Sequence, residues 1–124
     1  MSTEDNCACS GGPKLIFACS VAADVGAIAD QAARKMTRDG IGKMFCTAGV
    51  GGRVDAIMKT TESADDILAI DGCSLNCVKK SLELAGFKEF KHLQLADLGF
   101  EKCISPVTEE NIDKVIDKGK ELLA

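Results

Sequence analysis

The sequence has no tryptophan, no tyrosine and no excess of positive charge. Its formal net charge is −4, and its lysines are scattered along the chain instead of forming a basic stripe. A protein that binds nucleic acid needs a basic surface that neutralises the phosphates. We therefore expect no nucleic-acid partner.

Long apolar runs are also missing. No stretch contains about 18 consecutive apolar residues, the length that a membrane-spanning helix needs. Residues 1–13, MSTEDNCACSGGP, are polar and lack the apolar segment typical of a secretion signal. We expect a cytoplasmic protein with no membrane partner, in which residues 1–13 form a flexible tail and residues 14–124 form one α/β domain.

Cysteine, by contrast, is abundant for a chain in which we expect no export signal. Disulfides are rare in a reducing cytoplasm, and an odd number of cysteines cannot be fully paired. The composition therefore favours metal binding or thiol chemistry. The seven residues are Cys7, Cys9, Cys19, Cys46, Cys73, Cys77 and Cys103.

Apolar runs alternate with amphipathic segments four times along the chain. The runs at 14–20, 43–50 and 65–73 show no polar alternation, so we expect strands covered on both faces, whereas 90–99 alternates and predicts an edge strand. Helical spacing of apolar residues predicts helices within 24–40, 53–63, 74–86 and 108–124, with Asp24, Ser74 and Thr108 as caps. This order predicts a three-layer, doubly wound α/β fold, with a mainly parallel four-stranded sheet and helices on both faces.

Three cysteines recur at the same place in this pattern. Cys19, Cys46 and Cys73 are spaced 27 residues apart, each near the carboxyl end of its strand. These ends share one edge of a parallel sheet, where ligand sites form. Neighbouring strands lie about 4.8 Å apart, and sulfurs around a tetrahedral zinc lie roughly 3.8 Å apart. The three thiols can meet if the first strand lies between the second and third.

Cys77 adds a fourth thiol to this edge. It follows Cys73 by four residues and falls in the first turn of the predicted helix, where the helix dipole favours a thiolate. We therefore predict that Cys19, Cys46, Cys73 and Cys77 form one shared thiolate site at this edge. A site closed by four protein ligands indicates a structural or metal-handling role instead of hydrolysis.

Four segments carry a resemblance to a known family. They are "CS" after the first strand, "AGVGG" after the second, "AIDGCSLNC" after the third and "ADLGFEK" after the fourth. Together they resemble the DGC-domain family, named for a motif of the Asp71-Gly72-Cys73 type, over nearly all of residues 14–103. The resemblance implies zinc held by four cysteines at the positions above, and it implies no particular reaction. The chain departs from the usual pattern at Val21, where glycine is usual, and at Ser74, where proline is common.

Two other uses of the thiols stay open. Cys73 and Cys77 fit the attacking and resolving thiols of a sulfur-transfer or disulfide-exchange enzyme, although the spacing is C-x₃-C and not C-x-x-C. Four thiolates also suit an iron–sulfur cluster.

A glycine-rich segment follows the second apolar run. "CTAGVGGR" resembles the phosphatase loop C-x₅-R, but six residues separate Cys46 from Arg53, one too many for that loop. Its glycines Gly49, Gly51 and Gly52 form a turn that is a candidate site for a small anionic ligand.

The remaining polar candidates have structural interpretations. His92, the single histidine, is expected on the edge strand and away from the thiols, which argues against a cysteine–histidine pair. Asp24 and Asp71 fit a helix cap and a turn better than a catalytic role. Cys103 fits a loop cysteine, and no metal role is predicted for Cys7 and Cys9.

Overall fold

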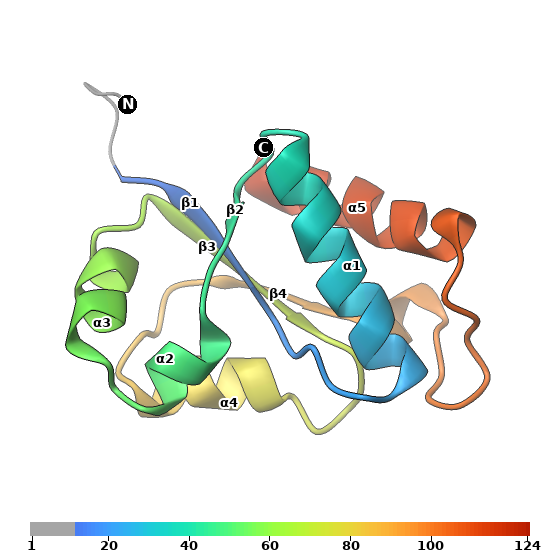
Figure 1. Ribbon diagram of the computed structural model, residues 1–124, viewed down its shortest axis with the longest axis horizontal. Coiled ribbons are helices and arrows are strands. Elements are labelled where there is room, and N and C mark those ends of the chain that lie inside the picture. The colour runs from blue at the N-terminus through green and yellow to red at the C-terminus, as the bar shows by residue number, and fades with distance from the viewer. Residues whose placement is uncertain (1–11) are drawn as a thin grey trace.

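Four parallel strands form the central sheet of the protein, which was obtained as a computed structural model that describes residues 12–124 (Figure 1). Their order across the sheet is β2-β1-β3-β4, and every neighbouring pair is parallel. The strands are β1 (Lys14–Ala18), β2 (Lys43–Met44), β3 (Asp66–Asp71) and β4 (Lys91–Gln94). The predicted parallel sheet is confirmed, with β1 between β2 and β3 and with β4 at one edge. Cys7 and Cys9 lie outside the described residues.

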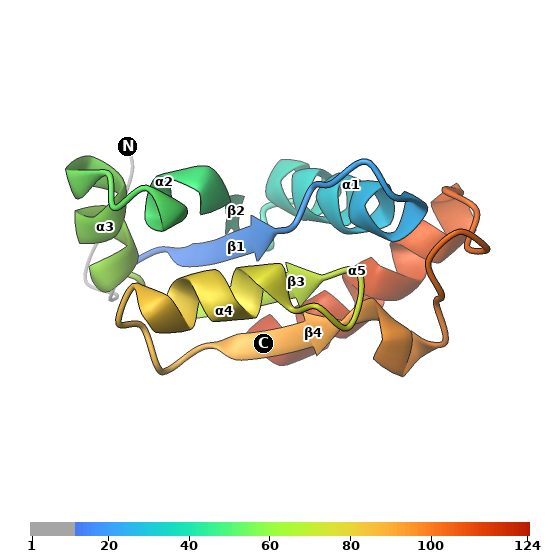
Figure 2. The same cartoon turned by 90° about the horizontal axis from the view of Figure 1, so that it is seen from below.

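Helices cover both faces of this sheet (Figures 1 and 2). Two of them, α1 (Asp24–Arg38) and α5 (Glu109–Leu123), pack on one face. The other face carries α2 (Thr47–Gly51), α3 (Asp55–Glu62) and α4 (Cys77–Leu84). This arrangement confirms the three-layer α/β fold. None of the helices described in residues 12–124 is both long and apolar enough to cross a membrane.

The central strand β1 explains why its apolar run lacks polar alternation. Ile16 and Ala18 point into the core beneath α1 and α5, whereas Leu15 and Phe17 point into the core beneath α4. All four are buried, because each face of the strand is covered by helices. Both cores therefore depend on this strand, whose carboxyl end leads directly to Cys19.

The second apolar run differs from its prediction as a strand over 43–50. Only Lys43–Met44 are in β2, and the chain turns at Cys46 into the short helix α2. The outward N–H of Met44 donates to the Thr37 hydroxyl at 2.8 Å, which closes this edge of the sheet. Val50 is buried in α2, and it would also be buried in a strand. Its apolar side chain alone therefore could not distinguish a helix from a strand at this position.

The predicted helix caps have different outcomes. Thr108 caps α5 as expected, because its Oγ1 accepts the N–H of Asn111 at 3.2 Å. Ser74 is not a cap, since α4 begins three residues later at Cys77 and follows Asn76, whose φ is +55°. Asp24 is the first residue of α1, and its carboxylate accepts backbone N–H groups from a distant loop as well as from Val25.

Candidate thiol and metal site

Three of the four predicted zinc ligands line one cavity at the carboxyl edge of the sheet. Cys19 follows the last residue of β1, Cys73 lies two residues beyond β3, and Cys77 begins α4. The cavity has a volume of about 240 Å³, and its walls include Val21, Leu75 and Lys102 besides the three thiols. The topology therefore brings together cysteines that are distant in sequence, as the strand pattern predicted.

Cys46 lies at the same edge but lines a different hollow. That hollow, of about 590 Å³, is formed by α1 and the end of β2, and its lining includes Arg34, Arg38 and Phe45. The Cys46 Sγ accepts the N–H of Gly49 at 3.2 Å and so caps α2. The structure separates Cys46 from the cavity of the other three thiols.

The side chains of residues 12–124 form no group of three or more Cys, His, Asp or Glu residues close enough to hold a metal ion. All five cysteines in this part of the chain are free thiols. Thiolates are preferred ligands of zinc, so the donors in the cavity suit the metal chemically. Their sulfurs would have to approach one another to bind it. Zinc binding by Cys19, Cys46, Cys73 and Cys77 stays a prediction.

Cys19 is half-buried and lines this cavity. Burial raises the pKa of Cys19 above its ordinary value, and the negative charge of Asp71 acts in the same direction, against hydrogen bonds from the backbone of Gly72 and Val21. In the metal-free protein Cys19 is therefore held as a neutral thiol at neutral pH. A metal ion that binds its sulfur must displace the proton.

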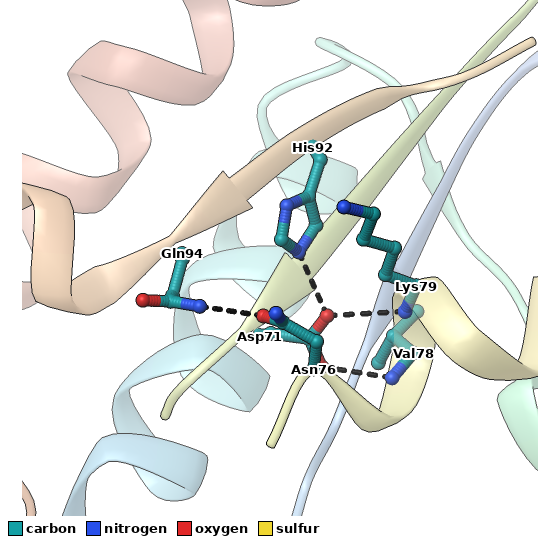
Figure 3. A network of polar contacts seen from close by, with 6 residues as sticks. All are labelled: Asp71, Asn76, Val78, Lys79, His92 and Gln94. Carbon is teal, nitrogen blue, oxygen red and sulfur yellow. Dashed lines mark hydrogen bonds and ion pairs between the residues drawn. The ribbon is translucent and has the colours of Figure 1, made fainter. Parts of the chain in front are cut away.

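Asp71, the last residue of β3, is a buried carboxylate with three hydrogen-bond partners (Figure 3). Its Oδ1 accepts the N–H of Val78 at 2.8 Å, and its Oδ2 accepts the N–H of Lys79 at 3.1 Å. These two donors belong to the first turn of α4, so Asp71 supplies the acceptor that a local cap would otherwise provide. The carboxylate also lies 2.9 Å from Nε2 of His92. Through these hydrogen bonds, Asp71 closes the loop that carries Cys73 and leads to Cys77.

The neighbouring strand β4 holds this loop at a second point. Gln94 Nε2 donates to Oδ1 of Asn76 at 2.6 Å (Figure 3), and Asn76 is in the left-handed backbone region that asparagine tolerates better than most residues. His92 was expected on the edge strand and away from the thiols; it lies in the edge strand β4 and is not among the residues that line the thiol cavity, although its ring reaches Asp71, which does line that cavity. The sequence did contain a signal, since His92 and Gln94 alternate along β4 and so share one face.

Gly72 lets the loop pass close to α1. A Cβ at this position would lie 2.8 Å from the backbone carbonyl carbon of Val25 and 2.9 Å from its oxygen. Real side chains do not approach backbone atoms this closely. The glycine of the Asp71-Gly72-Cys73 motif is therefore needed for packing against the first turn of α1.

Asp24 holds a second loop that contributes to the lining of the cavity. The Asp24 carboxylate accepts the N–H of Cys103 at 2.9 Å and the N–H of Ser105 at 3.0 Å, and these hydrogen bonds lower the pKa of Asp24. Lys102 in this loop lines the cavity. Cys103 is exposed and is not among the residues that line it, in keeping with a loop cysteine.

The glycine-rich segment after β2 is a helix rather than an open turn. The N–H of Gly49 donates to the Cys46 sulfur, and the N–H of Gly52 donates to the Ala48 carbonyl at 2.9 Å. Arg53 donates through Nη1 to the carbonyls of Val50 and Gly51. The small anionic ligand predicted near Gly49, Gly51 and Gly52 is not tested by these contacts and stays a prediction.

The fold and the cavity define a cysteine-rich α/β protein with thiols at the carboxyl edge of a parallel sheet. The sequence model of the DGC domain matches residues 15–118, and the chain belongs to the DGC domain family. The chain is also 38% identical, over 88 residues, to the "Anaerobic and virulence modulator AnvM" of Pseudomonas aeruginosa (strain PAO1). That match covers 71% of this chain and 67% of AnvM. No solved structure matches.

Proposed function

We propose that this protein binds Zn²⁺ through cysteine thiolates at the carboxyl edge of its sheet, in the cytoplasm, in a structural or metal-handling role. The observation that supports the proposal is the shared cavity of Cys19, Cys73 and Cys77. Zinc prefers thiolate ligands, and the three free thiols come from separate parts of the chain to line this one cavity.

The chain's own residues prepare this site. Asp71 and Asn76 fix the loop that presents Cys73 and Cys77, and Gly72 lets this loop lie against α1. Cys19, just beyond β1, would hold the metal from the other strand, and its thiol would have to lose its proton to do so. Bound zinc would tie the ends of β1 and β3 to the start of α4.

Elemental analysis of anaerobically purified protein tests the proposal. We expect a colourless protein with one zinc per chain, and loss of the zinc when any one of the four predicted ligands, Cys19, Cys46, Cys73 and Cys77, is replaced by serine. Cys103→Ser is the matched control, because Cys103 is a free thiol outside the cavity and should leave the zinc content unchanged. A protein without zinc, or a brown protein with iron and sulfide, would contradict the proposal.

Thiol–disulfide exchange by Cys73 and Cys77 is a second candidate. It is favoured by the two thiols lining one cavity while no group of three metal-binding side chains is gathered in residues 12–124. In this reaction one thiolate attacks a small disulfide and releases one thiol, and the second thiolate then releases the other and closes a Cys73–Cys77 disulfide. Mass mapping of metal-free protein after incubation with oxidised glutathione would show that disulfide, and absence of the pair would contradict this function.

A further inference from the structure

We propose that the hollow between α1 and β2 binds a small aromatic carboxylate. The two elements lie side by side at one edge of the sheet (Figure 1). The carboxylate group of the ligand pairs with the guanidinium groups of Arg34 and Arg38. Its ring contacts Met44 and Phe45. This site uses no metal ion, and it goes beyond the proposed zinc function.

The hollow has the size and the mixed lining of a small-molecule site. Its volume is about 590 Å³, and ligand pockets commonly have volumes of about 300–1,000 Å³. Met44 and Phe45 are half-buried and give the hollow an apolar wall, whereas the charged residues in its lining are the exposed Arg34 and Arg38. An apolar wall beside two cations fits a ligand that joins an apolar body to an anionic group.

Thr37 also lines the hollow, but its hydroxyl is already satisfied within the chain. It donates to the carbonyl of Ala33 at 2.8 Å and accepts the N–H of Met44 at 2.8 Å. The second contact occupies the outward N–H of β2, so a partner strand cannot extend the sheet through this group. The two guanidinium groups therefore remain to bind a ligand from outside the chain.

The two arginines are placed to act together. They are four residues apart on α1, so they project from adjacent turns on one face of the helix. The Nε of Arg34 donates to Oδ2 of Asp30 at 2.7 Å, and Oδ1 of Asp30 accepts the hydroxyl of Ser20 at 2.7 Å. These contacts orient the guanidinium group of Arg34 before a ligand arrives, and they leave its Nη groups as donors.

The charge balance of the hollow favours a ligand with a single negative charge. Asp30 offsets the charge of Arg34, whereas Arg38 makes no ion pair with any residue in 12–124. One uncompensated positive charge suits a carboxylate, which a guanidinium group binds through two parallel hydrogen bonds. A phosphate monoester carries more than one negative charge at neutral pH, so part of its charge would be unmatched.

The apolar wall favours an aromatic ring as the body of the ligand. Phe45 packs edge-to-face on Phe17, with ring centroids 6.0 Å apart, and this contact holds the Phe45 ring in a defined orientation. Aromatic rings make favourable offset or edge contacts with one another, and the thioether of methionine also makes favourable contacts with rings. Phe45 and Met44 together therefore offer a ring more than apolar area alone.

Titration of the anaerobically purified, ¹⁵N-labelled protein with 2-naphthoate tests the site by two-dimensional NMR. We expect saturable shifts of the amide signals of Met44 and Phe45, and none with the uncharged analogue 2-naphthamide. We also expect 2-naphthyl phosphate to bind more weakly than 2-naphthoate. Unchanged signals of both residues with 2-naphthoate would overturn the site, and tighter binding of the amide or the phosphate would overturn the assignment of a carboxylate.

Exposed arginine variants test how the carboxylate is held. Arg38→Gln should weaken the binding of 2-naphthoate by about three- to tenfold, because it removes the cation that has no ion pair. Arg38→Lys keeps the charge but loses the paired hydrogen bonds, so its affinity should lie between those of Arg38→Gln and the wild type. Lys80→Gln is the matched control, since Lys80 is exposed on α4, across the sheet. Equal affinities of Arg38→Gln and the wild type would contradict the proposal.

Discussion

The carboxylate of Asp71 and the ring of His92 lie 2.9 Å apart, on the neighbouring strands β3 and β4. Asp71 is 1% exposed, so its charge is withdrawn from water and depends on these partners. Two of its partners are N–H groups at the start of α4, and the third comes from β4. Asp71 therefore ties β3 to β4 and to α4, immediately before the loop that begins with Gly72 and Cys73.

Replacement of Asp71 by alanine should destabilise the protein. The change leaves the buried N–H of Val78 without its acceptor and removes the partner of His92. We expect the free energy of unfolding to fall by about 2–3 kcal/mol, the cost of losing charge-assisted hydrogen bonds and leaving a buried donor unsatisfied. Urea unfolding followed by circular dichroism measures this difference.

Asp97→Ala is the matched control for this change. Asp97 is exposed, and its side chain makes no hydrogen bond to any residue in 12–124. Its replacement should alter the free energy of unfolding by less than about 0.5 kcal/mol. If the two substitutions lowered the free energy of unfolding equally, the buried hydrogen bonds of Asp71 would make no specific contribution to stability.

Replacement of Gly72 by alanine should damage the thiol loop through packing alone. The added Cβ would lie 2.8 Å from the backbone carbon of Val25, and backbone atoms cannot move aside as a flexible side chain can. We expect a loss of about 1–3 kcal/mol, as for other overpacked positions, measured by the same unfolding experiment.

Gly51→Ala is the control for the glycine change. Nothing lies within 4 Å of a Cβ at Gly51, which is exposed at the end of α2. This variant should be as stable as the wild type or more stable by up to about 1 kcal/mol, because alanine favours helix. If Gly72→Ala were equally harmless, the close approach of the loop to α1 would not be a constraint on the motif.

The sequence was sufficient to predict the sheet and its helices because apolar runs and helical spacing reflect burial directly. Ile16 and Phe17 are apolar in succession because β1 is covered on both faces. The same signal failed at Val50, where a buried helix and a buried strand carry the same apolar residues. The closing of the β2 edge by Thr37 is a tertiary contact that no local pattern contains.

The candidate site was predictable only as far as topology determines it. The recurrence of cysteine after successive strands placed Cys19, Cys46 and Cys73 at one sheet edge, and the structure confirms that edge. Which thiols share a cavity depends on side-chain direction, and there Cys46 differs because its sulfur caps α2. The contact of His92 with Asp71 depends on strand register, which the sequence does not specify.

A final prediction concerns acid and the loop that carries Lys102. The N–H groups of Cys103 and Ser105 hydrogen bond to the Asp24 carboxylate and lower the pKa of Asp24 below its ordinary value of 3.8. A carboxyl group whose pKa is lower in the folded protein contributes stability above the unfolded pKa, and this contribution is lost as the pH falls through the folded pKa. The wild type should therefore be more stable than Asp24→Asn at neutral pH.

The advantage of the wild type over Asp24→Asn should stay constant down to pH values just above 3.8 and shrink below it. Urea unfolding of both proteins over a pH series measures the difference, with Asp97→Asn as an exposed control. Amide exchange provides a local measure, because Asp24→Asn weakens acceptors of the Cys103 and Ser105 N–H groups and should speed exchange there first. A difference that grows as the pH falls would show that the Asp24 carboxylate does not hold this loop, because protonation of the wild type can only remove its contribution.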